Sequence, residues 1–521
     1  MIKYPIGIQD FRELRTGGYV YIDKTEYIHR LITSGKYYFL SRPRRFGKSL
    51  LISTLKYLYL GQKELFSGLW IENRHNWEHH PVLHFSFSAI GYKDIGLNQA
   101  LIQMLERVAT DYDIELTRPG LALKFSELLE KLSRLKGKIV LLIDEYDKPL
   151  VDYIDDLEQA DINREVFKNF FSVIKDADPY LHLLLITGVS KFSKVSLFSD
   201  LNNLEDITFT AYGAKLTGYT QAELDHYFKT GLKQLSKNLA ISYKQLIDKV
   251  RTWYNGYQWW VGEKLYNPFS ILSLFKYQQF SNYWWETGTP TFLVKKLKEG
   301  FHFKLEELEA GTDLFESYTL ENLEWKSLLF QTGYLTIKQY DPEYRLYTLG
   351  FPNLEVKDAM YRHLLGAFRE AGKSESQALF AKIKRSLEAN DLEAFIQHIN
   401  VLFSTIPHQI FLQKQEAFFH AVLHISFSGV GLLTQSEVST AEGRVDTAVH
   451  TQEHIFVMEF KLDGSAKSAL AQIRDKSYGT PYLNQAKSVI AVGINFSSKE
   501  KVVAEWATMP YLELLKKDFS S

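Results

Sequence analysis

The stretch from Arg42 to Ser49, RPRRFGKS in one-letter code, constrains most strongly what this chain can fold into. It follows the apolar and aromatic run Tyr37 to Leu40 and precedes Leu50 to Leu55, which is apolar at helical spacing. The pattern predicts a strand, a tight loop and a helix. Because the first N–H groups of a helix lack partners and lie at the positive end of its dipole, this context favours phosphate binding.

Three residues of this stretch carry the chemistry of a phosphate-binding loop. Gly47 lets the backbone approach a phosphate, Lys48 offers its charge to the β and γ phosphates, and Ser49 offers a hydroxyl to Mg2+. The complete pattern, G-x-x-x-x-G-K-[ST], has a further glycine where this chain has Arg42. Taken alone, the stretch is compatible with a nucleotide site or with a basic turn before a helix.

Composition sets the broad class of the protein. With 521 residues the chain is too long for a single core, and about two to four domains are expected. The 61 basic and 62 acidic residues give a net charge of -1, so a nucleic-acid surface would have to be local. The absence of cysteine excludes disulfides, thiolate zinc sites and cysteine nucleophiles. Since no signal core or membrane-spanning run is evident, we expect a cytoplasmic protein with no membrane partner.

Apolar runs and helical patterns alternate after the loop. Val82 to Phe87 and Leu181 to Ile186 are expected to be strands, and Lys138 to Leu142 is typical of a strand buried on both faces of a parallel sheet. The helices expected between them are Leu97 to Thr110, Phe125 to Leu135 and Arg164 to Lys175. This alternation predicts an open α/β fold with a parallel sheet.

A second nucleotide motif ends the central apolar run, where Asp144 and Glu145 follow Val140 to Ile143. Ligands of an open α/β sheet bind at the carboxyl ends of its strands, so these acids are expected beside the loop. Asp144 would hold Mg2+ together with Ser49, and Glu145 would orient and deprotonate the attacking water. The alternative is a strand that ends in acids at a turn. Thr187, at the end of the next strand, either senses the γ phosphate or caps its turn.

Four segments, IQDFRELRTGGYVYIDKT, FLSRPRRFGKSLL, LLIDEYDKP and ITGVSKFSKVSLFSDLNNLEDI, resemble the AAA-ATPase-like family found with a C-terminal nuclease domain. The loop is also similar to that of archaeal-type regulatory ATPases of the signal-transduction class, which carry paired arginines. The resemblance implies ATP binding at Lys48 and Ser49 with Asp144 and Glu145, and Glu145 is the expected catalytic carboxylate. The full set of expected nucleotide-binding residues is Arg44, Arg45, Phe46, Gly47, Lys48, Ser49, Asp144 and Thr187.

Two features of these segments leave alternatives open. Arg42 departs from the general pattern and puts ATP turnover in more doubt than ATP binding, because a side chain occupies a position normally kept bare. Lys191 and Lys194 either contact phosphate from a neighbouring subunit or are solvated surface lysines.

A second constellation lies near the carboxyl end, in GRVDTAVHTQEHIFVMEFK, which runs from Gly443 to Lys461. Glu459 and Lys461 are two apart on an expected strand, so both project from the same face, and Asp446 on the preceding strand can reach that face. Such carboxylates favour a hard divalent cation, and the ammonium can position or polarise water for phosphodiester hydrolysis. The alternative is an exposed strand face with a cross-strand ion pair.

This region resembles the PD-(D/E)XK nuclease superfamily over roughly residues 410 to 510, as helix, three strands, helix and strand. The flanking helices are expected at Gln413 to His424 and Ser465 to Tyr478, and the final strand at Ser488 to Gly493. The resemblance implies that Asp446, Glu459 and Lys461 form the catalytic core, with the two acids as metal ligands. It also implies accessory roles for Glu416 and Gln472.

The expected organisation is a P-loop AAA-like ATPase domain over residues 1–215, a mostly helical lid or linker region over 216–405, and an α/β, restriction-endonuclease-like domain over 406–521. Between them, Thr220 with Glu223 is a capping-box start of a helix. The tryptophan pairs at 259–260 and 284–285 are expected to pack between helices rather than to stack bases.

These patterns favour an ATP-regulated, Mg2+-dependent nuclease acting on DNA in preference to RNA, in defence against foreign nucleic acid. ATP and Mg2+ are the expected cofactors, and Mn2+ is an alternative at the nuclease site. A second hypothesis is an ATP-dependent, oligomerising switch or scaffold whose nuclease-like domain binds nucleic acid or a partner without cutting. A third is a DNA-translocating motor.

Overall fold

The computed structural model describes the chain except residues 1, 192–196, 199–200, 202, 261, 286–304, 316–323, 370–372, 405–421, 424–425, 428–432, 441–442 and 518–521, with backbone only at 365–369, 373–377, 433–440 and 443–446. It divides into two compact units, Met1–Thr287 with Glu306–Asn353, and Gly288–Leu305 with Leu354–Ser521. The domain boundaries expected at about residues 215 and 405 stay predictions.

The first unit is built on a parallel sheet of five strands in the order β2-β3-β4-β1-β5. The order places β4 between β3 and β1, so the carboxyl ends of these strands lie side by side. Every residue of β1 and β3 is buried, as expected for strands covered on both faces. The prediction of an open parallel α/β sheet is confirmed. The strands are β1 (Tyr37–Ser41), β2 (Val82–Ser86), β3 (Ile139–Asp144), β4 (Leu181–Gly188) and β5 (Glu205–Asp206).

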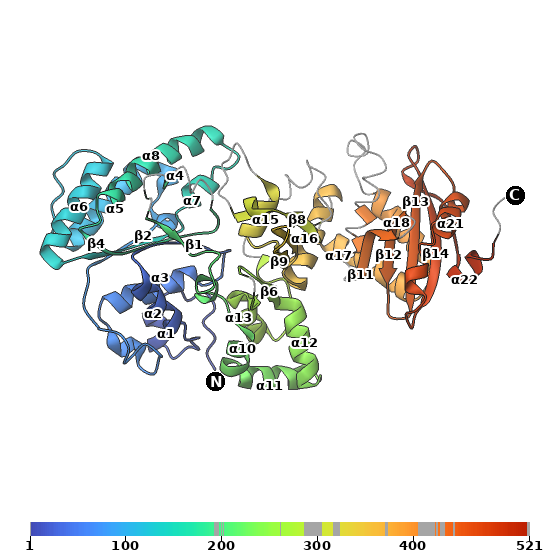
Figure 1. Cartoon of the computed structure of the whole chain (residues 1–521), viewed down its shortest axis with the longest axis horizontal. Helices are drawn as coiled ribbons and strands as arrows, with labels where there is room; N and C mark the ends of the chain where they lie inside the picture. Colours follow the sequence, from blue (N-terminus) through green and yellow to red (C-terminus); the bar gives the residue numbers. More distant parts are fainter. Residues whose placement is uncertain are drawn as a thin grey trace. The chain divides into compact units, whose positions relative to one another are not determined.

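Helices cover both faces of this sheet (Figure 1). One face carries α1 (Phe11–Thr16), α2 (Thr25–Ser34) and α3 (Lys48–Tyr59), and the other carries α5 (Leu97–Asp111), α6 (Leu121–Lys136) and α8 (Leu157–Lys175). The short helices α4 (Tyr92–Ile95) and α7 (Lys148–Val151) join them. Both α6 and α8 begin earlier than their apolar periodicity predicts, because Gly120 and Asp156 provide the N-caps.

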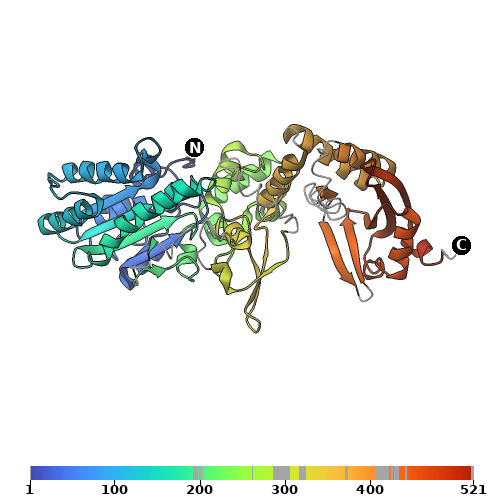
Figure 2. The ribbon, with the colours of Figure 1, turned by 90° about the horizontal axis from the view of Figure 1, so that it is seen from above.

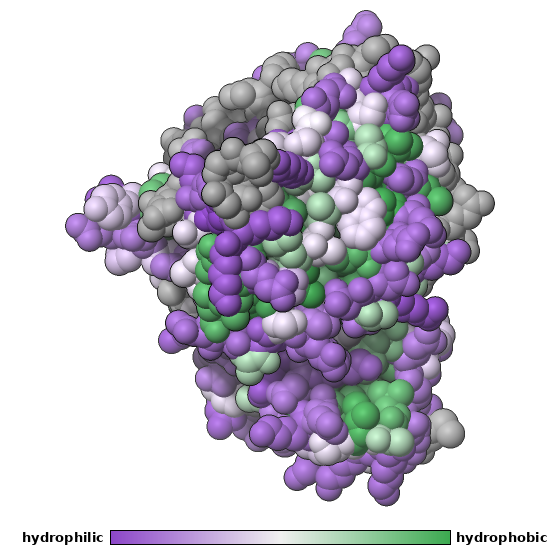
Figure 3. Space-filling model, turned by 90° about the vertical axis from the view of Figure 1, so that its right-hand side faces the viewer, coloured by the Kyte–Doolittle hydropathy of each residue, from purple (hydrophilic) through white to green (hydrophobic). Residues whose placement is uncertain are grey.

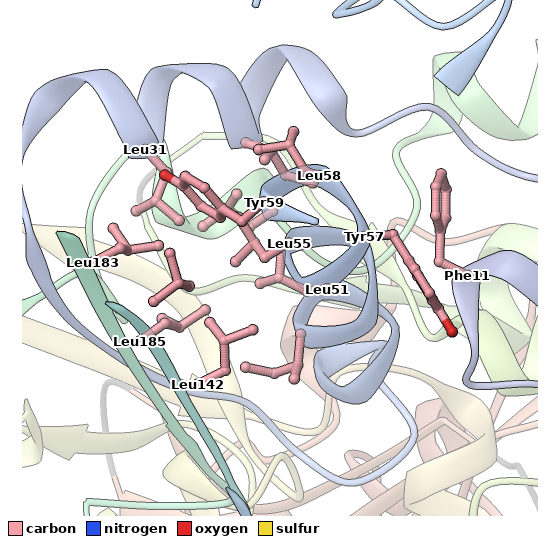
Figure 4. Close-up of a cluster of buried hydrophobic side chains, with 14 of the residues drawn as sticks. Phe11, Leu31, Leu51, Leu55, Tyr57, Leu58, Tyr59, Leu142, Leu183 and Leu185 are labelled. Atoms are coloured by element: carbon pink, nitrogen blue, oxygen red, sulfur yellow. The ribbon is translucent and has the colours of Figure 1, made fainter. Parts of the chain in front are cut away.

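The core between α3 and the sheet fixes the helix that follows the loop. Leu51 and Leu55 of α3 face Leu142, Leu183 and Leu185 of the sheet, and all of them are buried (Figure 4). Burying side chains of this kind stabilises a fold by about 1.5–3 kcal/mol each. The start of α3 is therefore anchored to the sheet that carries Asp144.

A mostly helical region completes the first unit. Thr220 and Glu223 form the capping box that the sequence predicts at the start of α10. Its three-stranded antiparallel sheet has the order β8-β10-β9, and Figure 2 shows the hairpin of β9 and β10 extending beyond the helices. The elements are α10 (Gln221–Tyr227), α11 (Lys229–Asn238), α12 (Tyr243–Tyr254), β6 (Asn255–Tyr257), β7 (Leu265–Tyr266), α13 (Pro268–Tyr277), β8 (Leu308–Ala310), α15 (Trp325–Gln331), β9 (Thr336–Asp341) and β10 (Leu346–Gly350).

The second unit contains a mixed sheet of five strands in the order β11-β12-β13-β14-β15. Only the β13–β14 pair is parallel among its described strands. The elements are α16 (Leu354–Arg369), α17 (Lys373–Glu388), α18 (Leu392–Ser404), β11 (Leu433–Thr440), β12 (Gly443–His450), β13 (His454–Leu462), α21 (Ala466–Asp475), β14 (Ser488–Ser497), β15 (Val502–Pro510) and α22 (Tyr511–Leu514).

The expectation that Ser488 to Gly493 is the final strand is wrong. The strand continues to Ser497, and β15 pairs with it in antiparallel orientation. Because β15 lies at the sheet edge and most of its residues keep some exposure, its sequence lacks the apolar run that marks a buried strand. The expected helix Gln413 to His424 lies almost wholly outside the described residues.

Within the described parts of the chain, no helix has the length and apolar character needed to cross a bilayer. Hydrophilic side chains predominate on the face shown in Figure 3, where hydrophobic ones gather in small groups.

A pair of stacked histidines lies at the amino-terminal end of the sheet. The rings of His80 and His182 stack at 4.0 Å between centroids, and the ring of Tyr59 lies edge-on to His182 at 5.3 Å. Burial, His80 and Lys138 lower the pKa of His182 to about 4. The folded state therefore favours the neutral imidazole more strongly than the unfolded chain does.

We expect the free energy of unfolding to fall as the pH is lowered from about 6.5, the pKa of an unperturbed histidine, to about 4. In this window the unfolded chain binds more protons at His182 than the folded protein does. Urea unfolding midpoints measured between these limits test this, with His182→Gln as the comparison. An equally steep loss of stability in His182→Gln would contradict the assignment.

Candidate functional sites

The loop after β1 has the backbone of a phosphate-binding loop. Gly47 is the N-cap of α3 and has a φ of 92°, in the left-handed region where a side chain is strained. Arg45, two residues earlier, also has a positive φ of 64°. The predicted succession of strand, loop and helix is confirmed, and the start of α3 points its N–H groups toward the loop.

Lys48 lies inside this loop with its side chain buried. Its Nζ donates hydrogen bonds to the carbonyl oxygen of Arg42 at 2.8 Å and to that of Pro43 at 3.1 Å. Burial lowers the pKa of Lys48 below its usual range, whereas the carboxyl groups of Asp144, Glu145 and Asp147 act in the opposite direction. The ammonium is therefore held in the loop and lies near three acidic side chains.

Asp144 ends β3 and is oriented by the neighbouring strand. The hydroxyl of Thr187, at the end of β4, donates to Oδ1 of Asp144 at 2.5 Å, and both residues are buried. The structure therefore brings these two predicted residues together. Glu145 is half-buried with a φ of 56°, a strained conformation of the kind that clusters at functional sites.

Asp147 is a third acid near the loop that the sequence analysis does not single out. It is 1% exposed, and its Oδ2 accepts hydrogen bonds from the backbone N–H groups of Val189 and Ser190, each at 3.0 Å. Burial raises the pKa of Asp147, and these two N–H groups act against that shift. The only sequence signal was its place in the acidic run DEYD after the strand.

The paired arginines and Phe46 form the part of the loop that contacts the helical region. Arg44 and Arg45 are exposed, and the guanidinium of Arg45 lies 5.1 Å from the ring centroid of Phe269. Phe46 is fully buried, with its ring edge-on to that of Tyr257 at 4.8 Å. The indole of Trp284 donates to the carbonyl oxygen of Arg44 at 2.9 Å. The helical region therefore packs against the loop, and Phe46 fills this contact.

Two expectations about basic residues need correction. The side chain of Arg42 is turned into a buried contact with the segment 208–213, where it donates to backbone carbonyls, so the loop is not obstructed by it. Lys191 is 7% exposed and pairs with Asp206 at 2.8 Å, so it is neither a solvated lysine nor free to contact another subunit. Lys194 lies outside the described residues.

A pocket opens beside the loop. Gly47, Leu50 and Leu51 line one side of it, and the stretch Leu216–Tyr219 lines another. Lys24 also lines the pocket, where its Nζ pairs with the carboxylate of Glu223 on α10 at 2.7 Å. The remaining lining residues are mostly apolar: Pro5, Leu14, Val20, Tyr21, Ile22, Ile28, Phe46, Thr54 and Pro268. The pocket is small, about 60 Å³, and its mostly apolar lining lies next to the loop.

In the second unit, the structure brings Glu459, Lys461 and Gln472 together. Glu459 and Lys461 lie on one face of β13, and Gln472 lies on α21. The Nζ of Lys461 donates to Oε1 of Glu459 at 3.0 Å and to Oε1 of Gln472 at 2.6 Å. The Nε2 of Gln472 in turn donates to the hydroxyl of Tyr478 at 3.4 Å. Glu459 is 1% exposed, whereas Lys461 is half-buried.

The other nuclease residues are placed only by their backbone or not at all. Asp446 belongs to β12, where the following residue, Thr447, lies opposite Met458, the residue before Glu459. The side chain of Asp446 and the whole of Glu416 lie outside the description. Within the described side chains, no group of three or more His, Asp or Glu is arranged to hold a metal.

Two family models match the chain. One, described as a predicted AAA-ATPase, covers residues 5–198, and the other, the PD-(D/E)XK nuclease superfamily, covers residues 414–506. A protein of Azotobacter chroococcum mcd 1, called "Uncharacterized protein in vnfD 5'region", is 37% identical over 518 residues, which are 96% of this chain and 98% of that protein. The chain belongs to the predicted AAA-ATPases with a C-terminal PD-(D/E)XK nuclease superfamily domain.

For this AAA-ATPase a solved structure, that of the Aeropyrum pernix ORC1 protein in complex with DNA, is similar over 67% of this chain and 95% of that one. Its sequence identity is 11% and its TM-score is 0.25, and a likeness of this extent does not bear on function. The family assignment therefore depends on the two family models and on the full-length relative.

Gly188, at the end of β4, packs closely against Tyr146 and Asp147, which follow β3. A Cβ added at Gly188 would lie 2.4 Å from the ring of Tyr146 and 3.0 Å from Oδ1 of Asp147. We expect Gly188→Ala to lower the free energy of unfolding by about 1–3 kcal/mol through overpacking. Urea denaturation measures this loss, and the loss should shrink in a Tyr146→Leu background, because the ring is then absent. Equal losses in both backgrounds would show that this contact is not the cause.

Proposed function

We propose that this AAA-ATPase is an ATP-regulated, divalent-metal-dependent nuclease that hydrolyses phosphodiester bonds of DNA. The observation that carries the proposal is that one chain holds both a buried lysine in a phosphate loop and a Glu459–Lys461 ion pair on a nuclease-type sheet. The first site suits nucleotide phosphates, and the second suits a phosphodiester and a metal ion.

Nucleotide binding would use groups that the loop already holds in place. The phosphate oxygens of ATP would take over the hydrogen bonds that Lys48 makes with the loop carbonyls, and the first N–H groups of α3 would add theirs. Ser49 and Asp144 would hold the Mg2+ that neutralises phosphate charge. Glu145 is suited to orient water, and the base would lie against the mostly apolar surface beside the loop.

At the nuclease site, the chain supplies a carboxylate, an ammonium and a residue that positions it. Glu459 would hold Mg2+ or Mn2+ together with Asp446, and the metal would supply Lewis acidity to the phosphate. Lys461 would hold the attacking water, and Gln472 fixes the direction of its Nζ. Glu416 is proposed as an accessory acid on the metal side.

Lys48→Ala tests the nucleotide site. Removing the charge-assisted contact should weaken ATP binding by about 1.5–3 kcal/mol, or roughly 10- to 150-fold. Isothermal titration with ATP and Mg2+ measures the change. Lys56→Ala, on the same helix, is the control and should bind as the wild type does. Unchanged ATP affinity in Lys48→Ala would remove the loop from the site.

Lys461→Ala tests the nuclease site. The loss of the group that positions water should lower the cleavage rate by about 100- to 10,000-fold. Cleavage of plasmid and single-stranded DNA and of RNA with Mg2+ is compared with and without ATP. Glu459→Gln should behave like Lys461→Ala, and Lys499→Ala, an exposed lysine in the same domain, should leave the rate unchanged.

The cleavage assay, together with measurements of assembly size and of ATP turnover, distinguishes the other two hypotheses. Cleavage that survives Glu459→Gln contradicts the catalytic assignment. A change in assembly size with ATP, and no cleavage by the wild type, supports the oligomerising switch or scaffold. Sustained ATP turnover that DNA stimulates supports the motor.

A further inference from the structure

Arg42 replaces the first glycine of the phosphate-loop pattern, and its side chain is the largest of the fully buried ones among the described residues. Its Nη1 donates to the carbonyl oxygens of Ser41 at 2.7 Å and Thr208 at 2.8 Å. Its Nη2 donates to the carbonyl oxygen of Gly213 at 2.9 Å. A planar guanidinium carries its donors on separate nitrogens in fixed directions, so it reaches acceptors on two segments at once, whereas an ammonium donates from a single nitrogen.

The segment held by Arg42 leads into the stretch that lines the pocket beside the loop. Ser41 N–H donates to the hydroxyl of Thr208 at 3.0 Å, close to the point where Arg42 binds it. A Cβ at Gly213 would lie 1.9 Å from the carbonyl oxygen of Ile207, so the backbone turns tightly there. A few residues on, the N–H of Gly218 donates to the carbonyl oxygen of Phe46 at 3.3 Å, and Leu216–Tyr219 lines the pocket. The stretch from Thr208 to Gly218 therefore contacts the loop near both of the loop's ends.

The guanidinium of Arg42 also contacts the helical region. It lies 5.2 Å from the ring centroid of Trp259, which is 2% exposed. The ring of Trp259 is edge-on to that of Phe46 at 5.9 Å. Arg42 therefore joins the end of β1, the segment 208–213 and the tryptophan that packs on Phe46.

Arg42 would affect nucleotide binding by positioning Lys48. The carbonyl oxygen of Arg42 accepts a hydrogen bond from Nζ of Lys48, while the N–H of Arg42 donates to the carbonyl oxygen of Gly188 at 3.0 Å. Anchoring the side chain of Arg42 thus fixes the backbone atom that positions the lysine. Without the guanidinium, the carbonyl oxygens of Thr208 and Gly213 would lose their charged donor, and the loop would lose this anchor.

We propose that Arg42 is a positioning residue for nucleotide binding, which takes over by side-chain anchoring the role that a glycine usually has in such loops. The inference rests on the proposed function, in which this loop binds ATP. It has a counter-intuitive consequence: restoring the glycine of the general pattern impairs the site.

Arg42→Gly should weaken binding of ATP with Mg2+ by about tenfold or more, measured by titration calorimetry on protein that circular dichroism shows to be folded. Arg42→Lys keeps the charge but not the planar fork, and should weaken binding by a smaller factor. Lys191→Met is the matched control. It removes another buried cation, one that pairs with Asp206 at the end of β5, just before the segment that Arg42 holds, and should leave ATP affinity unchanged.

A double-mutant cycle separates positioning from a general structural role. If Arg42 acts through Lys48, Arg42→Gly should cost little further affinity once Lys48 is alanine. Wild-type or tighter ATP binding by Arg42→Gly, or an equal loss in Lys191→Met, overturns the proposal. Should Arg42→Gly not fold, Arg42→Lys decides: wild-type affinity there overturns the proposal. Failure of the wild type to bind ATP would instead overturn the proposed function.

Discussion

The contacts of the buried ammonium of Lys48 are the constraint around which the loop site of the first unit is arranged. A charge withdrawn from water is tolerated only where acceptors and opposite charges surround it. The carbonyl oxygens of Arg42 and Pro43 are the acceptors, and Asp144, Glu145 and Asp147 supply the opposite charge. The start of α3, the ends of β3 and β4 and the turn of the loop are all fixed relative to this lysine, so a phosphate would meet a site that is already formed.

The sheet order turns separate motifs into one site. Because β4 lies between β3 and β1, Thr187 reaches Asp144 while Gly188 accepts from the backbone of Arg42. In the second unit, fewer elements are needed to bring the side chains of the site together. Glu459 and Lys461 share one face of a strand, and Gln472 comes from a helix. Neighbouring strands bring the side chains together in the first unit, and the two-residue period of a single strand does so in the second.

Local pattern predicts the elements well where one physical cause dominates. The apolar runs of β3 and β4 and the capping box at Thr220 follow from burial and helix capping. The local pattern fails to predict a feature that depends on a residue outside that pattern. The starts of α6 and α8 depend on N-cap residues that lie outside the apolar stripe. The formation of β15 depends on its pairing with β14 at the sheet edge, and the burial of Lys191 depends on its ion pair with Asp206.

The sequence by itself determined which residue types are available for phosphate chemistry and in what local order, because spacing along a strand, loop or helix dictates which way neighbouring side chains face. It could not tell where Arg42 points, because its partners are backbone carbonyls at positions 208 and 213, far along the chain. It also missed Asp147, whose partners lie on the loop after β4. Only the tertiary structure decided these contacts, since they depend on which strands become neighbours.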